Sequence, residues 1–171
     1  IEVIVVDNNP SMRLSQELQN EFSDVKFVKS DHNRGFGGGM NLAMKHARGK
    51  FYLIFNPDII LLEGTLEEMH KYMQENPRVG MVGPKLLNPD KTLQYSCFRF
   101  MKPALIFYRR VPFLRSMKKA KQEVDLYLMK DWNHQSVKEV DYLLGAAMFV
   151  RASAVADVGP FDEDFFVYFE D

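Results

Sequence analysis

Three short polar clusters stand at the borders of apolar runs in the first 60 residues. They are Asp7 to Asn9, Asn33 to Gly39, and Asn56 to Asp58. Mg²⁺ and Mn²⁺ prefer hard oxygen ligands, and one or two carboxylates suffice when a diphosphate and water supply the rest. Asp58 follows Pro57 on a rigid turn and is therefore a candidate ligand. The alternative is an ordinary turn Asp ahead of Glu63 and Gly64.

The last ten residues, 162-DEDFFVYFED-171, alternate carboxylates with aromatic side chains. Apolar surroundings raise the pKa of a carboxyl group, and such an acid can remove a proton from a substrate hydroxyl. Asp171, with Glu170 beside it, is therefore a candidate general base. The alternative is a solvated amphipathic loop whose rings pack on the core.

The segment 35-GFGGG-39 is similar to a phosphate-binding loop, but it matches neither common fingerprint. It lacks the Lys-Ser/Thr pair of a Walker motif, and Met40 stands where a dinucleotide fingerprint has its third glycine. The glycines can equally serve a positive φ angle and a close approach of helix to sheet.

The apolar pattern of the chain predicts alternating strands and helices. Strands are expected at 1–9, 25–28, 51–55 and 79–82, where β-branched and aromatic residues gather. Three helices are expected. The first follows Ser11 and repeats Leu14, Leu18 and Phe22 at one-turn spacing. The second carries Met40, Ala43, Met44 and Ala47 on one face, and the third covers 65–75. This alternation predicts a Rossmann-like open α/β sheet, mostly parallel, in three α/β/α layers. Ligands of such sheets bind at the carboxyl ends of the strands, where the three polar clusters stand.

Periodicity weakens over 88–138, which is basic and aromatic, and returns in 140–159 as two strands and a short helix closed by Gly159. We divide one domain, 1–171, into a nucleotide-binding half (1–87), an insertion (88–138) over the active-site edge and an acceptor half (139–171). Residues 91–122 hold nine Lys or Arg and no Asp or Glu. This predicts either peripheral contact with anionic lipid through 99–121 or a solvated helix with a buried aromatic face.

Composition excludes several classes of protein. A length of 171 residues suits one domain that buries roughly two thirds of its unfolded surface. A net charge of −1 argues against a nucleic-acid binder, and a single cysteine, Cys97, excludes an internal disulfide. The apolar runs are too short for a membrane span. We expect a cytoplasmic protein, peripheral at the inner face of the membrane, and interpret the chain as a fragment truncated at both ends.

The ordered motifs make the chain similar to the family 2 glycosyltransferases of the GT-A fold, in particular the rhamnosyltransferase-like branch. The motifs are 5-VVDNN-9, 33-NRGFGGGMNLAMKHARG-49, 52-YLIFNPD-58, 83-GPKLLNPDKTLQYS-96 and 140-VDYLLGAAMFVRASAVADVGPFDEDFFVYFED-171. The family usually begins with one more strand and continues past its Glu-Asp motif, and both parts are missing here.

The resemblance implies a role for each motif residue. The donor nucleotide would contact Asp7 and Asn9 and would lie along Asn33, Arg34 and Gly35. Asn56 would take the place of the first acid in a DxD-like motif. The remaining implied residues are Asp58 for the metal, Gly145 and Ala146 for the sugar and acceptor pocket, and Asp171 with Glu170 for the catalytic base.

The implied reaction is an inverting transfer of rhamnose or a similar sugar from a dTDP- or UDP-sugar, with Mg²⁺ or Mn²⁺, to a saccharide or lipid-linked acceptor in cell-surface polysaccharide synthesis. Two alternatives stay open. One is a non-catalytic nucleotide-binding module, and the other is a sugar nucleotidyltransferase, although 7-DNNPSMRLSQ-16 lacks the expected glycine- and Arg/Lys-rich loop.

Overall fold

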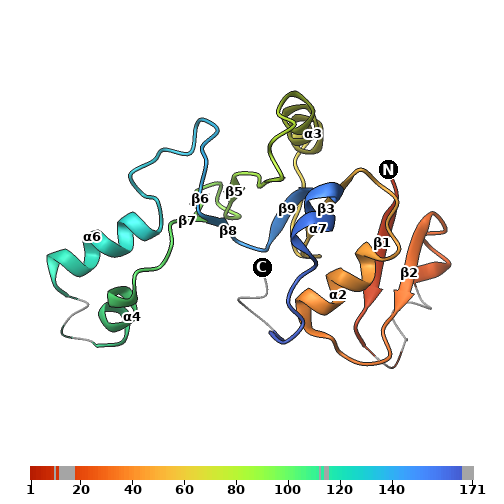
Figure 1. Ribbon diagram of the computed structural model, residues 1–171, viewed down its shortest axis with the longest axis horizontal. Helices are drawn as coiled ribbons and strands as arrows, with labels where there is room; N and C mark the ends of the chain where they lie inside the picture. Colours follow the sequence, from red (N-terminus) through yellow and green to blue (C-terminus); the bar gives the residue numbers. More distant parts are fainter. Residues whose placement is uncertain (10, 12–17, 112, 114–115, 167–171) are drawn as a thin grey trace. The chain divides into compact units, whose positions relative to one another are not determined.

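Strands and helices alternate through the first 82 residues, as the apolar pattern predicts. The computed structural model describes residues 1–9, 11, 18–111, 113 and 116–166. They fall into two units, which we describe separately (Figure 1): unit 1 is 1–82 with 147–171, and unit 2 is 83–146. The predicted helix after Ser11 includes residues 12–17, which lie outside the described part.

Unit 1 begins with a parallel pair of strands. β1 (Val3–Asp7) and β2 (Val25–Lys29) pair with Val3 opposite Val25, so both strands end at the same edge. The next helix, α2 (Gly35–Met44), packs beside β1. β-Branched residues make up four of the five residues of β1 and two of the five of β2, which also contains Phe27. Such residues favour extended backbone, which is why the sequence pattern located both strands within two residues.

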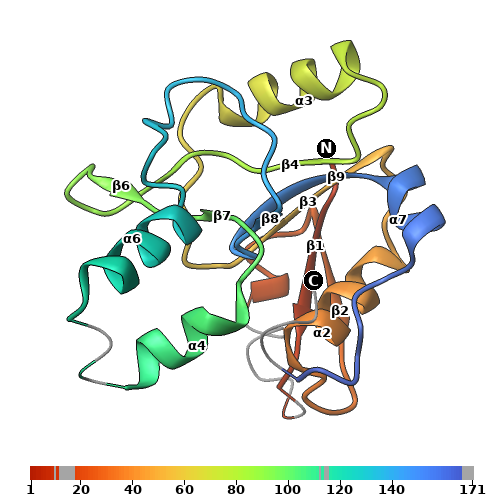
Figure 2. The ribbon, with the colours of Figure 1, turned by 60° about the vertical axis from the view of Figure 1, so that its left-hand side comes forward.

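A second sheet in unit 1 has the order β3-β9-β4 (Figure 2). Its strands are β3 (Phe51–Phe55), β4 (Met81–Val82) and β9 (Ala147–Arg151), with α3 (Thr65–Glu75) between β3 and β4 and α7 (Ala152–Val158) after β9. β9 runs antiparallel to both neighbours, so β3 and β4 run in the same direction. The predicted α/β class is confirmed, with one reversed strand inserted into the β3-α3-β4 crossover.

β4 is shorter than predicted at its start. The N–H of Val79 donates to the carbonyl of Asn76 at 3.0 Å and closes a turn after α3, so pairing begins only at Met81.

The β3-β9-β4 sheet is buried on both faces. Leu53 and Phe149 are register partners, and Phe149 packs with Met69 and Met73 of α3. The adjacent partners, Ile54 and Met148, point to the opposite face because side chains alternate along a strand. Both are buried there as well, which agrees with a layered α/β arrangement.

Arg151 joins α3 to the end of β9. Its Nη2 donates to the carbonyl of Met73 at 2.7 Å, and its Nε donates to the carbonyl of Val79 at 3.2 Å. The last carbonyls of a helix lack partners within the helix and carry partial negative charge, which suits a guanidinium. The centroid of the Phe51 ring lies 5.0 Å from the guanidinium carbon, so the same side chain also makes a cation–π contact.

The buried face of α2 differs from the prediction. Met40, Ala43 and Met44 are only partly buried, and Ala47 lies beyond the end of the helix. The buried residues are instead four glycines and an asparagine: Gly35, Gly37, Gly38, Gly39 and Asn41. The prediction was wrong because it assumed that Met and Ala side chains form the contact face, whereas the buried positions of this helix are glycines and one asparagine.

Unit 2 contains two short antiparallel pairs and two helices. The pairs are β5 (Leu86–Leu87) with β6 (Leu93–Gln94), and β7 (Cys97–Phe98) with β8 (Tyr142–Leu143); the helices are α4 (Pro103–Arg110) and α6 (Lys118–Tyr127). Phe98 stacks on Tyr142 with ring centroids 4.8 Å apart. β8 pairs with β7 rather than with β9, so the Gly145–Ala146 turn ends unit 2 and does not close a hairpin.

Met73→Ala should lower the free energy of unfolding by about 3 kcal/mol, because the side chain is 0% exposed and its loss leaves a cavity against Phe149. Urea unfolding followed by circular dichroism should show a lower midpoint with an unchanged slope. The control is Met81→Ala, whose side chain is 42% exposed. Equal losses in both variants would contradict this account of the core.

Candidate functional site

The carboxyl ends of β1 and β2 meet the first turn of α2. The N–H of Ser30, just after β2, donates to the carbonyl of Asp7 at 3.0 Å, which continues the parallel pairing by one bond. Asp7 is buried, and its carboxylate accepts the N–H of Asn9 at 2.9 Å. The strand therefore ends in a fixed turn that holds a carboxylate at the edge of the sheet.

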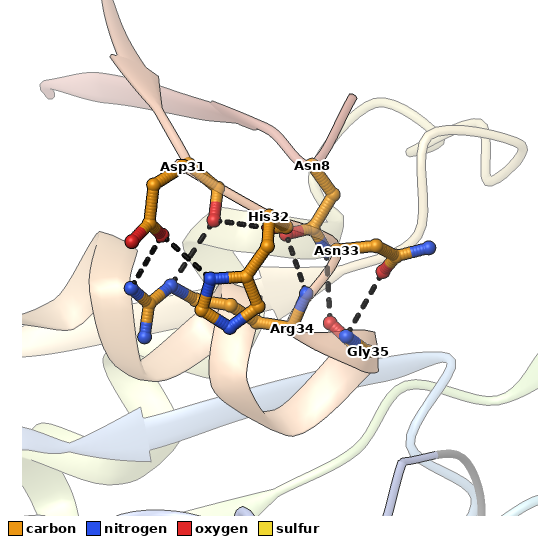
Figure 3. Close-up of polar contacts among 7 residues, drawn as sticks. Asn8, Asp31, His32, Asn33, Arg34 and Gly35 are labelled. Carbon is orange, nitrogen blue, oxygen red and sulfur yellow. Dashed lines mark hydrogen bonds and ion pairs between the residues drawn. The ribbon is translucent and has the colours of Figure 1, made fainter. Parts of the chain in front are cut away.

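Asn8 connects this turn to α2, as Figure 3 shows. Its Nδ2 donates to the carbonyl of Gly35 at 2.8 Å, and its Oδ1 accepts the N–H of Arg34 at 3.4 Å. Within the helix, a Cβ added at Gly39 would lie 2.9 Å from the Asn8 Nδ2, closer than such atoms approach. Asn8 thus occupies the space that a side chain at position 39 would need.

The loop from Ser30 to Gly35 is held by its own side chains (Figure 3). Asn33 accepts the N–H of Gly35 through its Oδ1 at 3.0 Å. Arg34 donates from Nη2 to Asp31 at 2.7 Å and from Nε to the hydroxyl of Ser30 at 3.1 Å. The hydrogen bond and the charge of Arg34 hold the pKa of Asp31 below its usual value. The loop is therefore ordered by polar contacts among its own residues, and three further hydrogen bonds link it to Asp7 and Asn8 at the end of β1.

The start of α2 also contacts the C-terminal segment. The N–H of Phe36 donates to the carbonyl of Phe166 at 3.3 Å, and the ring of Phe36 meets that of Phe161 edge to face at 6.0 Å. Gly35 has a φ of +70°, and a Cβ there would overlap the Phe166 carbonyl. Both facts require glycine at this position. The glycines of 35–39 belong to a helix that other segments approach closely, which supports the second of the two interpretations given above.

Asn41 fixes the C-terminal segment to α2. Its side chain is 2% exposed and makes three hydrogen bonds. Nδ2 donates to the carbonyl of Phe161 and to Glu163 Oε1, both at 2.9 Å, while Oδ1 accepts the N–H of Phe161 at 3.0 Å. Sequence reasoning assigned no role to Asn41. The available signal was its position, one turn after Gly37 and Gly38 on the face that carries no side chains.

Asn56 to Asp58 form a turn at the end of β3, in the same unit. The N–H of Ile59 donates to the carbonyl of Asn56 at 3.1 Å, with Pro57 at the second position, where its fixed φ suits a β-turn. Asp58 is exposed, and within the described residues its carboxylate has no hydrogen bond or ion pair to a protein group. Among the described residues, no hydrogen bond links this turn to Asn8 or to the loop that follows β2.

The exposed carboxylate of Asp58 fits a divalent cation of the Mg²⁺ or Mn²⁺ type. The described residues contain no group of three or more His, Cys, Asp or Glu that would enclose a metal. A single accessible oxygen ligand on a rigid turn leaves most coordination positions for phosphate oxygens and water, as these ions require.

The other predicted residues lie elsewhere. Asn9 is exposed beside Asp7, and Gly145 and Ala146 are the last residues of unit 2, immediately before β9. Ala147, the first residue of β9, is the register partner of Phe55, which directly precedes Asn56. Glu170 and Asp171 lie outside the described residues. The segment ahead of them is the one that Asn41 holds.

Known proteins match the whole chain. Residues 1–129 match the profile of a family described as glycosyl transferase family 2. An N-acetylglucosaminyl-diphospho-decaprenol L-rhamnosyltransferase from Mycobacterium tuberculosis is 26% identical over 100% of this chain and 58% of its own length. The rhamnosyltransferase WbbL from Escherichia coli is 29% identical over 99% of this chain and 63% of its own length. The chain thus spans about three fifths of the length of these relatives.

A solved structure shares the fold. The mannosyltransferase PcManGT from Pyrobaculum calidifontis, in complex with GDP-mannose and Mn²⁺, superposes with a TM-score of 0.55 at 19% identity. The match covers 95% of this chain and 39% of that protein.

Asn41→Ala should destabilise the chain by about 2 kcal/mol, because it leaves the N–H and carbonyl of Phe161 without partners. Hydrogen exchange at the Phe161 amide should accelerate more than that at the core amides of β9. The control, Gln74→Ala, removes an exposed helical amide and should change neither quantity. Unchanged exchange at Phe161 would show that Asn41 does not hold this segment.

Proposed function

Because the chain belongs to glycosyl transferase family 2, we propose that it forms the donor-binding part of an inverting glycosyltransferase. The transferred sugar is rhamnose or a similar hexose, carried by dTDP or UDP, and the acceptor is a saccharide or a lipid-linked sugar in cell-surface polysaccharide synthesis. The observation that carries the proposal is the polar edge at which Asp7, Asn8 and the loop 30–35 are joined by hydrogen bonds. The printed names of the two rhamnosyltransferases support the choice of sugar.

In this proposal the nucleotide lies along the ends of β1 and β2. The buried carboxylate of Asp7 is an acceptor suited to the ring N–H of uracil or thymine, and Asn9 lies exposed beside it. Asn33, Arg34 and Gly35 follow the nucleotide toward α2. Hydrogen bonds hold these residues in place before the nucleotide binds. Residues that are already ordered lose less conformational entropy on association, which supports a preformed pocket.

The proposed metal ligand is Asp58, with Asn56 at the start of the same turn. The exposed carboxylate and the Mn²⁺ in the mannosyltransferase complex support this role. When bound, a divalent cation neutralises negative charge on the diphosphate leaving group. Pro57 fixes the turn and so limits the directions in which the Asp58 carboxylate can point.

We assign the catalytic base to Asp171, with Glu170 as its neighbour in the family motif. Asp171 removes the proton of the acceptor hydroxyl while that oxygen attacks the anomeric carbon, and the bond from this carbon to the diphosphate oxygen breaks on the opposite side. One displacement of this kind inverts the anomeric configuration. The contacts of Asn41 and Phe36 with residues 161–166 support the role, because they anchor the backbone that leads to the base. Gly145 and Ala146 are proposed to line the sugar and acceptor pocket.

A cytoplasmic location suits this proposal. The single cysteine, Cys97, is a buried free thiol, and burial raises its pKa above the usual value. The thiolate form is therefore disfavoured, which agrees with a structural rather than a reactive role.

Asp58→Ala should weaken Mn²⁺-dependent binding of dTDP or UDP at least tenfold, or about 1.4 kcal/mol, because the metal loses its only proposed carboxylate. Calorimetric titration with and without Mn²⁺ measures the effect. The control is Asp157→Ala, which removes an exposed carboxylate from α7 with the same change of charge. Nucleotide binding that Mn²⁺ leaves unchanged in the wild-type chain would argue against the metal site.

Asp171→Asn should lower kcat about a hundredfold or more in the whole protein, since the amide cannot accept the acceptor proton. Binding of the donor nucleotide should stay unchanged. Asp164→Asn, in the same segment and exposed, serves as the matched control. Full activity of Asp171→Asn would favour the alternative of a nucleotide-binding module without turnover.

A further inference from the structure

Unit 2 exposes large apolar side chains along one short stretch, from Phe100 to Met117. The three phenylalanines are the most exposed: Phe100 at 75%, Phe107 at 64% and Phe113 at 77%. Ile106, Val111 and Met117 are each exposed by 40% or more. Single exposed apolar residues are common, but six within one stretch of chain indicate a surface that contacts something apolar.

Helix α4 shows that this exposure is directional. Leu105 is 2% exposed and supplies the buried side of the helix, which packs with α6. Ile106 and Phe107, the next two residues around the helix, are exposed. Arg110 follows one turn later on the same side, because residues three and four apart are neighbours on a helix. The outer side of α4 is thus apolar with a cation at its end.

The helices among the described residues include none long and apolar enough to cross a membrane.

The charges around this stretch are strongly segregated. Residues 99–131 contain nine Lys or Arg and three Asp or Glu, while the chain as a whole has 22 and 23. Each of the three acids is already in an ion pair: Glu123 with Lys102 at 2.9 Å, Asp125 with Lys130 at 2.7 Å, and Asp131 with Arg99 at 2.7 Å. By sequence, the segment carries a net charge of nine minus three, or +6. The rest of the chain carries the balancing excess of acid.

We propose that this basic-aromatic face, formed by the described residues between 99 and 121, docks onto the surface of an anionic phospholipid membrane. Interfacial segments of this kind insert aromatic side chains at the headgroup level while Lys and Arg attract anionic lipid. The rest of the chain carries an excess of acid and is repelled by the same surface. Docking rests on this face alone; its use in reaching a lipid-linked acceptor rests on the proposed function.

A membrane fits the observations better than a nucleic acid. The exposed phenylalanines occupy the outer side of a short helix and the residues that flank it, whereas proteins that bind single strands stack bases along a basic groove. The chain as a whole is slightly acidic, with a net charge of −1. A concentration of positive charge in one stretch of an otherwise acidic chain suits an anionic surface.

Co-sedimentation with vesicles tests the proposal. The chain should bind phosphatidylcholine vesicles that contain about 30% phosphatidylglycerol and not pure phosphatidylcholine, and about 1 M salt should weaken binding. Two variants should each reduce the partition coefficient about tenfold or more: Phe107→Ser with Phe113→Ser, and Lys118→Glu with Lys119→Glu.

Two control variants make the same chemical changes in unit 1. Leu62→Ser with Val158→Ser removes exposed apolar side chains, and Lys71→Glu with Arg78→Glu reverses exposed charges. Both should bind vesicles as the wild type does, and circular dichroism should show that all four variants are folded. The proposal is overturned if anionic vesicles are not bound, or if the controls lose as much binding as the test variants.

Nucleotide titration without vesicles separates this test from the proposed function. Vesicle binding without nucleotide binding would uphold docking and count against the transferase assignment. Nucleotide binding without vesicle binding would support the transferase assignment and overturn docking.

Discussion

The arrangement of unit 1 depends on the close approach of other segments to the backbone of α2. Four of the first five residues of this helix have no side chain, so Asn8 and the carbonyl of Phe166 can lie against the helix itself. Ordinary helices keep neighbours at a distance set by their side chains. Here that spacing is lost on one face, and three parts of the chain converge: the end of β1, the loop after β2 and the C-terminal segment. The polar edge exists because these parts meet.

Much of the fold follows from local sequence patterns. β3 and α3 have the predicted bounds, since an apolar run of five residues and a helical repeat closed before Pro77 are strong local signals. The partners of the strands follow less directly. β9 inserts between β3 and β4, and β8 pairs with β7, because pairing is decided by packing among segments far apart in the chain. Local periodicity contains no information about that choice.

The candidate site shows the same division. Asp7, Asn33 and Arg34 lie at strand ends and ahead of a helix, as the sequence pattern predicts. Each makes a hydrogen bond within this edge: Asp7 to Asn9, Asn33 to Gly35 and Arg34 to Ser30. The buried face of α2 was not predictable from hydrophobicity, because the buried residues are four glycines and Asn41 rather than large apolar residues. A buried amide with all its hydrogen bonds satisfied looks, in sequence, the same as an exposed one. The roles of Asp58 and Asp171 remain predictions that rest on the resemblance to the family and on the support described above.

Asn41 binds the C-terminal segment mainly through main-chain atoms, since two of its three hydrogen bonds are with the N–H and the carbonyl of Phe161. The contact of Phe36 is also with a carbonyl, that of Phe166. Main-chain atoms are the same in every residue, so substitutions at 161 and 166 leave these bonds in place. The route of the backbone through these two positions is therefore set by hydrogen bonds that do not depend on which side chains they carry.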